Sequence, residues 1–242
     1  MSIKKVYYEH DTVTRTSVGV EYEKYLHQSQ SKYQKIEVIK TKLYGNALYL
    51  DGCFMLSEKN QDYYHNECLN LVSKSVKNIL IIGGGDFAIA AKLIKRKGIK
   101  NITIVEIDPK VVKISKKYFS NNFKQNKNEM KRIKLVQEDG MSYMKNNQHM
   151  FDCIIIDSTD PIGAAKVLFS KYFLGRCYES LCINGIIIQQ SGSPIKDMKK
   201  IIQPLVKRYS ELKFKHIQLS SFPMPLYPTG TWSFISAKRA RH

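Results

Sequence analysis

Two carboxylates that could exchange a proton with a ligand stand close together in the second half of the chain. Asp157 ends an apolar run of three isoleucines, and Asp160 follows it in the segment DSTDP, residues 157–161. On a turn at the end of a strand both side chains can face one site, where they raise each other's pKa or await a cation. A hydrogen-bonded Asx turn before Pro161 explains Asp160 as well, but leaves Asp157 unexplained.

A second group of polar residues surrounds a glycine-rich turn. Residues 83–88, GGGDFA, follow an apolar run, open a predicted helix and fit the pattern G-x-G-x-x-G/A. Glu106 ends the next apolar run, 20 residues after Asp86, where a carboxylate can accept both hydroxyls of a ribose. Asp139 and Gly140 end the third run and are placed to face an adenine amine. Together these residues suit an adenosyl ligand.

The negative charge of Asp86 favours one class of adenosyl ligand over another. A carboxylate beside the glycine turn repels a pyrophosphate, whose place is the helix N-terminus. It favours a ligand that carries an amine or a sulfonium there. An ordinary helix N-cap is the alternative interpretation of Asp86, and from the local sequence the two weigh about equally.

The elements that must position these residues change in character along the chain. The first third is rich in β-branched and aromatic residues, and Gly45-Asn46 and Asp51-Gly52 are turn signals. This part predicts a small antiparallel sheet with strands at 18–27, 33–41 and 47–50, followed by a helix at 60–73. From residue 78 short apolar runs alternate with helical stretches, which is typical of parallel strands covered on both faces.

The second part therefore predicts an α/β fold with a Rossmann-like, doubly wound sheet. Its strands are expected at 79–82, 102–105, 133–136, 154–156 and 186–188, its helices at 87–97, 109–119, 165–181 and 195–209, and a final antiparallel pair at 214–219 and 231–236. We expect two domains, residues 1–58 and 59–242. Because ligands bind at the carboxyl ends of such strands, the polar residues at those ends should meet at one site.

Composition narrows the class of protein. Hydrophobic residues make up 43% of the chain, as in globular proteins, and no apolar run approaches the roughly 20 residues that cross a bilayer. The N-terminus has no apolar h-region, so we expect a cytoplasmic protein. The five cysteines include no CxxC pair and are expected to be buried free thiols. No His/Cys cluster has the spacing of a metal site.

The net charge of +18 can mark a protein that binds nucleic acid or an anionic membrane. The lysines are spread along the chain, however, as they are on solvated helix faces, and no RNA-binding or zinc-finger motif accompanies them. Nucleic-acid binding is therefore disfavoured as the main function.

A series of short motifs links these observations to one family. In chain order they are Tyr33-Gln34, residues 45–52 (GNALYLDG), Tyr64-His65, residues 81–86 (IIGGGD), residues 105–108 (VEID), Asp139-Gly140, residues 157–161 (DSTDP) and Tyr227-Pro228. The sequence between about residues 18 and 238 resembles the spermidine synthases, or polyamine aminopropyltransferases, in which these motifs occur in the same order. The resemblance implies a methyltransferase-type doubly wound sheet preceded by a small N-terminal β domain, and a homodimer or homotetramer.

The resemblance also implies a reaction and a set of site residues. An aminopropyl group passes from decarboxylated S-adenosylmethionine, the co-substrate, to a diamine, with putrescine expected, giving spermidine and methylthioadenosine in polyamine biosynthesis. No metal or separate cofactor is implied. The donor would be held by Gln34, Gly83, Gly85, Asp86, Glu106, Asp139, Gly140 and Ala164. The acceptor would be bound by His65, Asp86, Asp157, Ser158, Asp160, Gln190 and Tyr227, with Asp157 and Tyr64 as catalytic residues.

The chemistry of this reaction explains why acidic residues are needed. The sulfonium activates the leaving group, so the enzyme must align the amine and keep it unprotonated. A free alkylamine resembles lysine, with a pKa near about 10.4, and is charged at neutral pH. Asp157 would accept its proton, while Tyr64 orients the nitrogen. Since both substrates are cations, an acidic site is expected within a strongly basic protein.

Several positions depart from the family pattern. Phe87 replaces a glycine, and its ring is expected to crowd the aminopropyl chain or to reshape the site. The other departures are Met55 for Gln, Asn60 and Gln61 for an acidic pair, Asn66 for Glu, and Ala164 for Pro. The lost acidic groups lie near the expected diamine end, so the identity of the amine stays open.

Two other functions are compatible with the same fold. An S-adenosylmethionine-dependent methyltransferase would share the sheet and Glu106, but Asp86 and Asp157 together suit a donor that has lost its carboxylate. A non-catalytic protein could use the fold and the positive charge to bind RNA or acidic partners, with a steep salt dependence.

Overall fold

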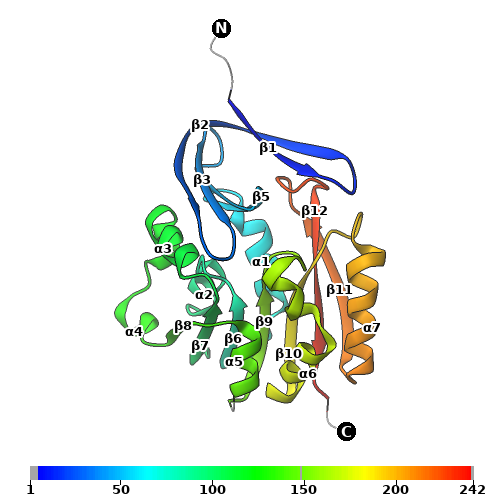
Figure 1. Ribbon diagram of the computed structural model, residues 1–242. Helices are drawn as coiled ribbons and strands as arrows, with labels where there is room; N and C mark the ends of the chain where they lie inside the picture. The colour runs from blue at the N-terminus through cyan, green and yellow to red at the C-terminus, as the bar shows by residue number, and fades with distance from the viewer. Residues whose placement is uncertain (1–4, 148, 241–242) are drawn as a thin grey trace.

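The chain forms a small N-terminal sheet and a larger mixed sheet flanked by helices (Figure 1). The computed structural model describes residues 5–147 and 149–240. The small sheet has five strands in sequential order: β1 (Val6–Asp11), β2 (Thr16–Gln30), β3 (Lys35–Thr41), β4 (Asn46–Leu50) and β5 (Cys53–Ser57). All of its pairings are antiparallel, as predicted.

Two strands of the small sheet, β1 and β5, were not predicted from the sequence. β5 is joined to β4 by the Asp51-Gly52 turn, where both residues have positive φ angles of 48° and 82°. Such a turn matches the twist of paired strands and makes a tight hairpin. In β1 the adjacent Tyr7 and Tyr8 are followed by Glu9 and Asp11, and the strand is recognisable only through its pairing with β2.

The large sheet has the order β11-β12-β10-β9-β6-β7-β8. Its strands are β6 (Asn78–Gly83), β7 (Asn101–Glu106), β8 (Ile133–Gln137), β9 (Phe151–Asp157), β10 (Leu181–Gly192), β11 (Lys215–Pro223) and β12 (Thr231–Lys238). Strands β6 to β10 pair in parallel, whereas β11 and β12 add the predicted antiparallel pair at one edge. The doubly wound fold expected from the sequence is confirmed.

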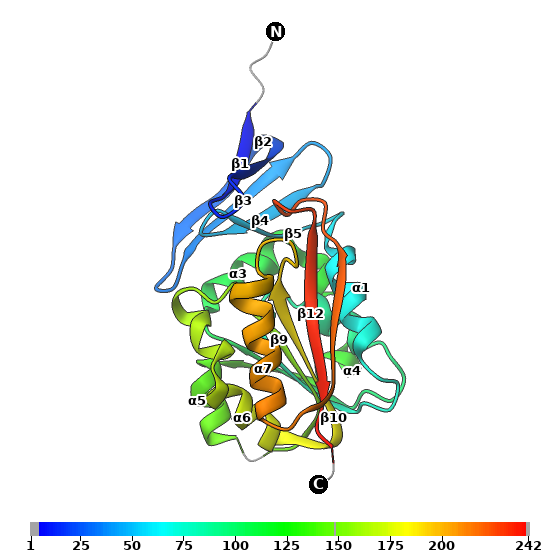
Figure 2. The same ribbon diagram turned by 90° about the vertical axis from the view of Figure 1, so that its right-hand side faces the viewer.

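Alternate side chains of the central strands enter two separate cores. Ile79 and Ile81 of β6 pack with α1 (Gln61–Leu71) and α2 (Ala88–Leu93), whereas Leu80 and Ile82 face the opposite side. There they meet α5 (Gly140–Asn146), α6 (Lys171–Ser180) and α7 (Gln203–Glu211). Figure 2 shows α5, α6 and α7 on one side of the large sheet and α1 on the other. Burial on both faces explains why these strands are continuous apolar runs.

Three predicted helices are shorter or interrupted. The helix expected at 165–181 is a 3-10 segment, Gly163–Phe169, followed by α6, because extended Ser170 caps α6 by accepting the Phe173 N–H. The one expected at 195–209 begins as a π-helical turn, Met198–Ile202, before α7, since Pro204 has no N–H to continue a regular helix. The helix expected at 87–97 is reduced to α2, and Gly98, with φ 98°, follows it.

The remaining helical segments are α3 (Pro109–Tyr118), α4 (Lys127–Met130) and a short 3-10 segment, Ser120–Phe123. α3 was predicted, and it packs Val111, Ile114 and the adjoining Phe119 against the small sheet. Tyr118 of α3 also donates a hydrogen bond to the Leu26 carbonyl of β2 at 2.8 Å. These contacts hold the small sheet over the carboxyl ends of the central strands, as Figure 1 shows.

The five thiols are free, but one of them contradicts the sequence prediction. Cys68, Cys153 and Cys177 are buried and Cys182 is half-buried, whereas Cys53 is exposed at the start of β5. The prediction was wrong there because the Asp51-Gly52 hairpin turn places Cys53 at a surface edge. Among the described residues, no helix is long and apolar enough to cross a membrane.

Candidate active site

The ends of three neighbouring strands bring Asp86, Glu106 and Asp157 together; we call them the inner carboxylates. Asp157 ends β9 beside Gly83 of β6, and Glu106 ends β7 on the other side of β6. The glycines make this approach possible. A Cβ atom on Gly83, whose φ is 87°, would lie 2.0 Å from the Asp157 carbonyl oxygen, and one on Gly85 would lie 2.8 Å from Glu106 Oε2.

Tyr64 connects helix α1 to Asp157 at the end of β9. The Tyr64 hydroxyl donates a hydrogen bond to Asp157 Oδ1 at 2.7 Å. Burial raises the pKa of Asp157 to about 7, and repulsion by Asp86 and Glu106 adds to this, while the hydrogen bond from Tyr64 lowers it. Burial also holds the pKa of Tyr64 well above its usual value, so the phenol stays a donor. A carboxylate with a pKa near neutrality suits a general base.

Glu106 is almost fully buried, with 8% of its surface exposed. Its Oε2 accepts the Gly85 N–H at 3.1 Å and its Oε1 accepts the Asp108 N–H at 2.9 Å. Burial raises the pKa of Glu106 to about 7 despite these two bonds. Each oxygen keeps a further lone pair, so the carboxylate can still accept hydroxyl groups of a ligand.

Asp86 is not the N-cap of α2, because that position is taken by Phe87. Its Oδ1 accepts the Ala88 N–H at 2.7 Å, as in an Asx turn just before the helix. Its negative charge adds to the burial that raises the pKa of Asp157, and it partly offsets the burial that lowers the pKa of His65. The backbone contact therefore holds the Asp86 carboxylate close enough to Asp157 to repel its charge.

No lysine or arginine among the described residues forms an ion pair with the inner carboxylates. This is unusual for a chain with a net charge of +18. Carboxylates that lie together without a cation repel one another, and a positively charged ligand relieves that repulsion. The described residues also contain no cluster of three His, Cys, Asp or Glu side chains that could hold a metal ion.

The other residues assigned to the donor are distributed around Glu106. Gln34 Nε2 donates to Asp108 Oδ2 at 3.1 Å, so the small sheet reaches this site through Asp108. Asp139 is half-buried and caps α5 by accepting the Ser142 N–H at 2.8 Å. Gly140 is buried against Ile82, and Ala164 is exposed in the 3-10 segment after β9. Asp108 was not assigned a role from the sequence, although it stands in the motif VEID.

A second acidic group includes Asp160, and its other members were missed from the sequence. Glu9 and Asp11 come from β1, Asp160 follows β9, and Asp197 precedes the π-helical turn; we call these four the outer carboxyls. Lys196 lies among them, with its Nζ 3.2 Å from Asp11 Oδ2 and 3.4 Å from Asp197 Oδ2. Only Asp160 was predicted, because the others lie far apart in the sequence.

Burial dominates the protonation of two outer carboxyls. It raises the pKa of Glu9 to about 7, although the carboxylate accepts the Phe54 N–H at 2.8 Å. It also raises the pKa of Asp160, while the charge of Lys196 lowers it. The pKa of Asp11 is instead lowered, because hydrogen bonds from Thr14 and Lys196 outweigh its burial.

Tyr227, Gln190 and Trp232 connect the two acidic groups. Gln190 Nε2 donates to the Thr159 carbonyl at 3.0 Å, and its Oε1 accepts the Trp232 indole N–H at 3.2 Å. The Tyr227 and Trp232 rings meet edge to face, 4.6 Å apart. Burial raises the pKa of Tyr227, and the charges of Glu9, Asp160, Asp157 and Asp86 raise it further. The charges of both groups therefore act on the Tyr227 hydroxyl.

Two smaller polar residues complete the predicted acceptor set. Ser158 donates to the Thr159 carbonyl at 3.1 Å. His65 is buried, with 3% exposed, and its ring lies edge-on to Tyr64. Its Nδ1 has no hydrogen-bond partner among the described residues, and burial lowers its pKa, which keeps the ring neutral at pH 7.

The residues that depart from the family pattern have contacts of their own. Phe87 has a left-handed backbone, φ 65°, and its buried ring packs on Phe123 at 4.6 Å. Gln61 accepts a hydrogen bond from Asn122, and Asn66 accepts one from Lys92. Met55 packs in the cluster between the small sheet and α3. Asn60 is buried, and its Oδ1 accepts no hydrogen bond from the part of the chain that the structure describes.

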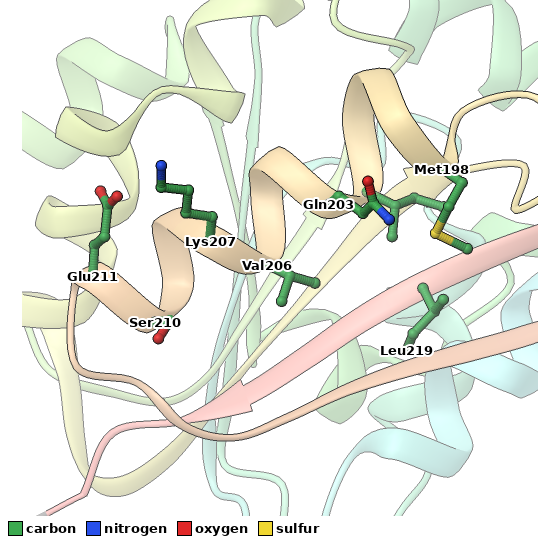
Figure 3. A pocket seen from close by; sticks show the side chains of 8 residues that line it. Met198, Gln203, Val206, Lys207, Ser210, Glu211 and Leu219 are labelled. Carbon is green, nitrogen blue, oxygen red and sulfur yellow. The ribbon is translucent and has the colours of Figure 1, made fainter.

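A surface groove of about 410 Å³ lies elsewhere, between α7 and β11 (Figure 3). Its lining includes Met198, Val206 and Leu219, with Lys207 and Glu211 toward one end. It contains none of the predicted site residues. The inner carboxylates lie instead at the strand ends beneath the small sheet.

Comparison with known proteins finds similarity to one family along almost the whole chain. Residues 61–242 match the family model "Spermine/spermidine synthase domain", and residues 1–58 match "Spermidine synthase tetramerisation domain". The chain is 32% identical to the polyamine aminopropyltransferase of Alkaliphilus metalliredigens, over 98% of this chain and 84% of that protein. It is 35% identical to the polyamine aminopropyltransferase of Clostridium botulinum, over 96% of this chain and 81% of that protein.

Solved structures agree with the sequence comparisons. A spermidine synthase in complex with the transition-state analogue AdoDATO superimposes with a TM-score of 0.89 at 28% identity, covering 98% of this chain and 80% of that one. The spermidine synthase from Thermotoga maritima superimposes with a TM-score of 0.86 at 26% identity, with the same coverage.

Proposed function

The chain belongs to the spermine/spermidine synthase family of polyamine aminopropyltransferases, and from this premise we propose that it transfers the aminopropyl group of decarboxylated S-adenosylmethionine to putrescine. The products are spermidine and methylthioadenosine. The observation that carries this proposal is the Tyr64–Asp157 hydrogen bond beside inner carboxylates that have no cation of their own among the described residues.

The reaction is a displacement at the carbon next to the sulfonium. The unprotonated amine nitrogen attacks this carbon, a C–N bond forms, the C–S bond breaks, and its electron pair returns to sulfur. Asp157 accepts the proton that the substrate ammonium must lose before the attack, and the product nitrogen leaves as a secondary ammonium. Tyr64 fixes the carboxylate through its hydrogen bond, so that the free oxygen can face the amine.

The donor side uses the residues around Glu106. We assign the ribose hydroxyls to Glu106, and the adenine end to Asp139 and Gly140. Gly83 and Gly85 leave room for the ligand at the turn, while Gln34 and Ala164 complete this side. Asp86 binds the ammonium of the aminopropyl chain, because it is the inner carboxylate at the helix start and its Oδ1 alone is taken by the Ala88 N–H.

The acceptor side runs from Asp157 toward the outer carboxyls. His65, Ser158, Gln190 and Tyr227 line it, and Asp160 binds the second ammonium of putrescine. The carboxyl of Asp160 is not ion-paired within the described residues, so it is available for this ammonium. The match of residues 1–58 to a tetramerisation domain supports assembly as a homodimer or homotetramer, and we propose a cytoplasmic location.

Mass-spectrometric turnover tests the proposal directly. Purified protein is given decarboxylated or intact S-adenosylmethionine with putrescine, cadaverine, diaminopropane, agmatine or spermidine. We expect spermidine and methylthioadenosine from the decarboxylated donor with putrescine. Methyl transfer from the intact donor would place the protein among methyltransferases, and no product from any pair would point to a binding role.

Asp86→Asn tests the assignment of the donor ammonium. Loss of the carboxylate should raise the KM for the decarboxylated donor at least about tenfold, because a charge-assisted contact is lost. Asp62→Asn is the matched control, since Asp62 is exposed and pairs with Lys92 on the outer surface. Equal KM values for the two variants would refute the assignment.

A further inference from the structure

Lys196 lies among the outer carboxyls, and the proposed reaction gives it no role. Its side chain is only 11% exposed, although lysine is among the residues least often buried. It lies in the segment between β10 and the π-helical turn, and neither the motifs nor the charge pattern of the sequence drew attention to it.

Three contacts fix the position of the Lys196 ammonium. Its Nζ lies 3.2 Å from Oδ2 of Asp11 in β1 and 3.4 Å from Oδ2 of Asp197, the next residue in the chain. The ammonium also lies over the Trp232 ring, 5.9 Å from its centroid. A cation held by two carboxylates and an aromatic face cannot swing freely into solvent. The charges of Asp197, Asp160 and Asp11 raise the pKa of Lys196, which burial alone would lower, so it stays protonated.

The same contacts connect Lys196 to residues assigned to the acceptor. Trp232, over whose ring the ammonium lies, donates a hydrogen bond to Gln190 and packs edge to face on Tyr227. Asp160 is affected by the charge of Lys196 but does not form an ion pair with it within 4.0 Å. A chain of contacts therefore leads from Gln190 and Tyr227 through Trp232 to Lys196.

We propose that Lys196 is a specificity-determining residue that ends the acceptor site after a diamine. Its stem and ammonium take the place that a third ammonium of a longer polyamine would need, and Asp11 and Asp197 are already paired with it. Asp160, with Glu9 nearby, remains for one further positive charge. Spermidine therefore leaves as product and is not used as the next acceptor.

This inference rests on the proposed function, and the ratio of two acceptors tests it separately. For each variant, kcat/KM is measured with putrescine and with spermidine, together with the inhibition constant of spermidine against putrescine. In Lys196→Ala, which removes both the charge and the stem, the spermidine-to-putrescine ratio should rise at least about tenfold, equivalent to about 1.4 kcal/mol. The inhibition constant of spermidine should fall by a similar factor.

Further variants separate a specificity role from a merely structural one. Lys196→Met keeps most of the stem without the charge, so it should show a smaller rise in the ratio and remains informative if the alanine variant folds poorly. Lys196→Arg keeps the charge and should keep the low ratio. Lys171→Met removes a lysine from an exposed ion pair with Glu211 and should leave the ratio unchanged.

The outcomes are distinguishable. A wild-type protein that transfers no aminopropyl group to any amine would refute the proposed function itself. Turnover of putrescine with an unchanged ratio and inhibition constant in both folded Lys196→Ala and Lys196→Met would overturn this inference and leave Lys196 as a structural tie between β1 and the large sheet.

Discussion

The two acidic groups of this protein are built from similar side chains but are balanced differently. The inner carboxylates Asp86, Glu106 and Asp157 lie at adjacent strand ends without a cation from the described chain. The outer carboxyls Glu9, Asp11, Asp160 and Asp197 surround Lys196. The inner group therefore depends on charged ligands for its balance, while the outer group carries a permanent counter-ion.

The difference follows from the elements that supply each group. All three inner carboxylates belong to one sheet, whose parallel strands end at a common edge. The outer group joins two sheets, with Asp11 from β1 and Lys196 from the segment after β10. The ion pair between Asp11 and Lys196 therefore also connects the small sheet to the large one and should stabilise the fold.

The largest expected effect is a loss of turnover that distinguishes the two groups. Asp157→Asn should lower kcat by about 10²–10⁴-fold, the usual contribution of general base catalysis, whereas Asp11→Asn should lower it less than about tenfold. The amide oxygen introduced by Asp157→Asn can still accept the Tyr64 hydrogen bond, so the fold is expected to be kept. The kcat of both variants is measured from the release of methylthioadenosine. Similar losses of kcat in the two would contradict a catalytic role for the inner group alone.

A pH profile provides the second comparison. Asp157 must be ionised to accept a proton, and its pKa and that of Glu106 are both raised to about 7. The kcat/KM for the donor should therefore fall at least about tenfold per pH unit as the pH drops below about 7. Because these groups interact, the observed midpoint belongs to the group rather than to one residue.

Ligand binding should move that midpoint. The positive charge of the bound donor favours the ionised carboxylates, so the profile of kcat should have its midpoint at a lower pH than that of kcat/KM. In Asp86→Asn, the loss of a neighbouring negative charge should also lower the midpoint. A profile that stays flat between about pH 5.5 and 8 would contradict the assignment of Asp157 as the base.

The smallest expected effect concerns stability at the outer group. Asp11→Asn weakens the contact with Lys196 but keeps an oxygen for the Val13 and Thr14 N–H groups, so it should lower the free energy of unfolding by about 2 kcal/mol at pH 7. The folded pKa of Asp11 is lowered, so this contribution exists above an unfolded pKa of about 3.9 and is lost as the pH falls through the folded value.

Thermal or denaturant unfolding at pH 7 and at pH 3 measures this contribution. The difference between Asp11→Asn and wild type should shrink at the lower pH. Asp62→Asn, which disturbs an exposed pair with Lys92, should have a much smaller effect at both pH values. An equal loss of stability in the two variants would mean that the outer ion pair is no stronger than a surface contact.

The sequence predicted the main features of the fold because they depend on local patterns. Apolar runs such as Ile79-Leu80-Ile81-Ile82 became the central parallel strands, and the turn signal Asp51-Gly52 became a hairpin with positive φ angles. The edges of elements were harder to predict. Ser170 and Pro204 divide two stretches that read as continuous helices, because a capping hydroxyl and a missing N–H act at single positions.

The candidate site also has a part that the sequence predicts and a part that it does not. Asp86, Glu106 and Asp157 were predicted to lie together because each stands at or just after a strand end, and parallel strands of one sheet end at a common edge. The types and order of these residues, and of Tyr64, are properties of the sequence alone. Only the tertiary structure placed Glu9, Asp11 and Lys196 beside Asp160, since that meeting depends on how a separate sheet docks over the strand ends. No local pattern encodes such a contact between residues 185 positions apart, so the packing between the two sheets decided which charges lie around Lys196.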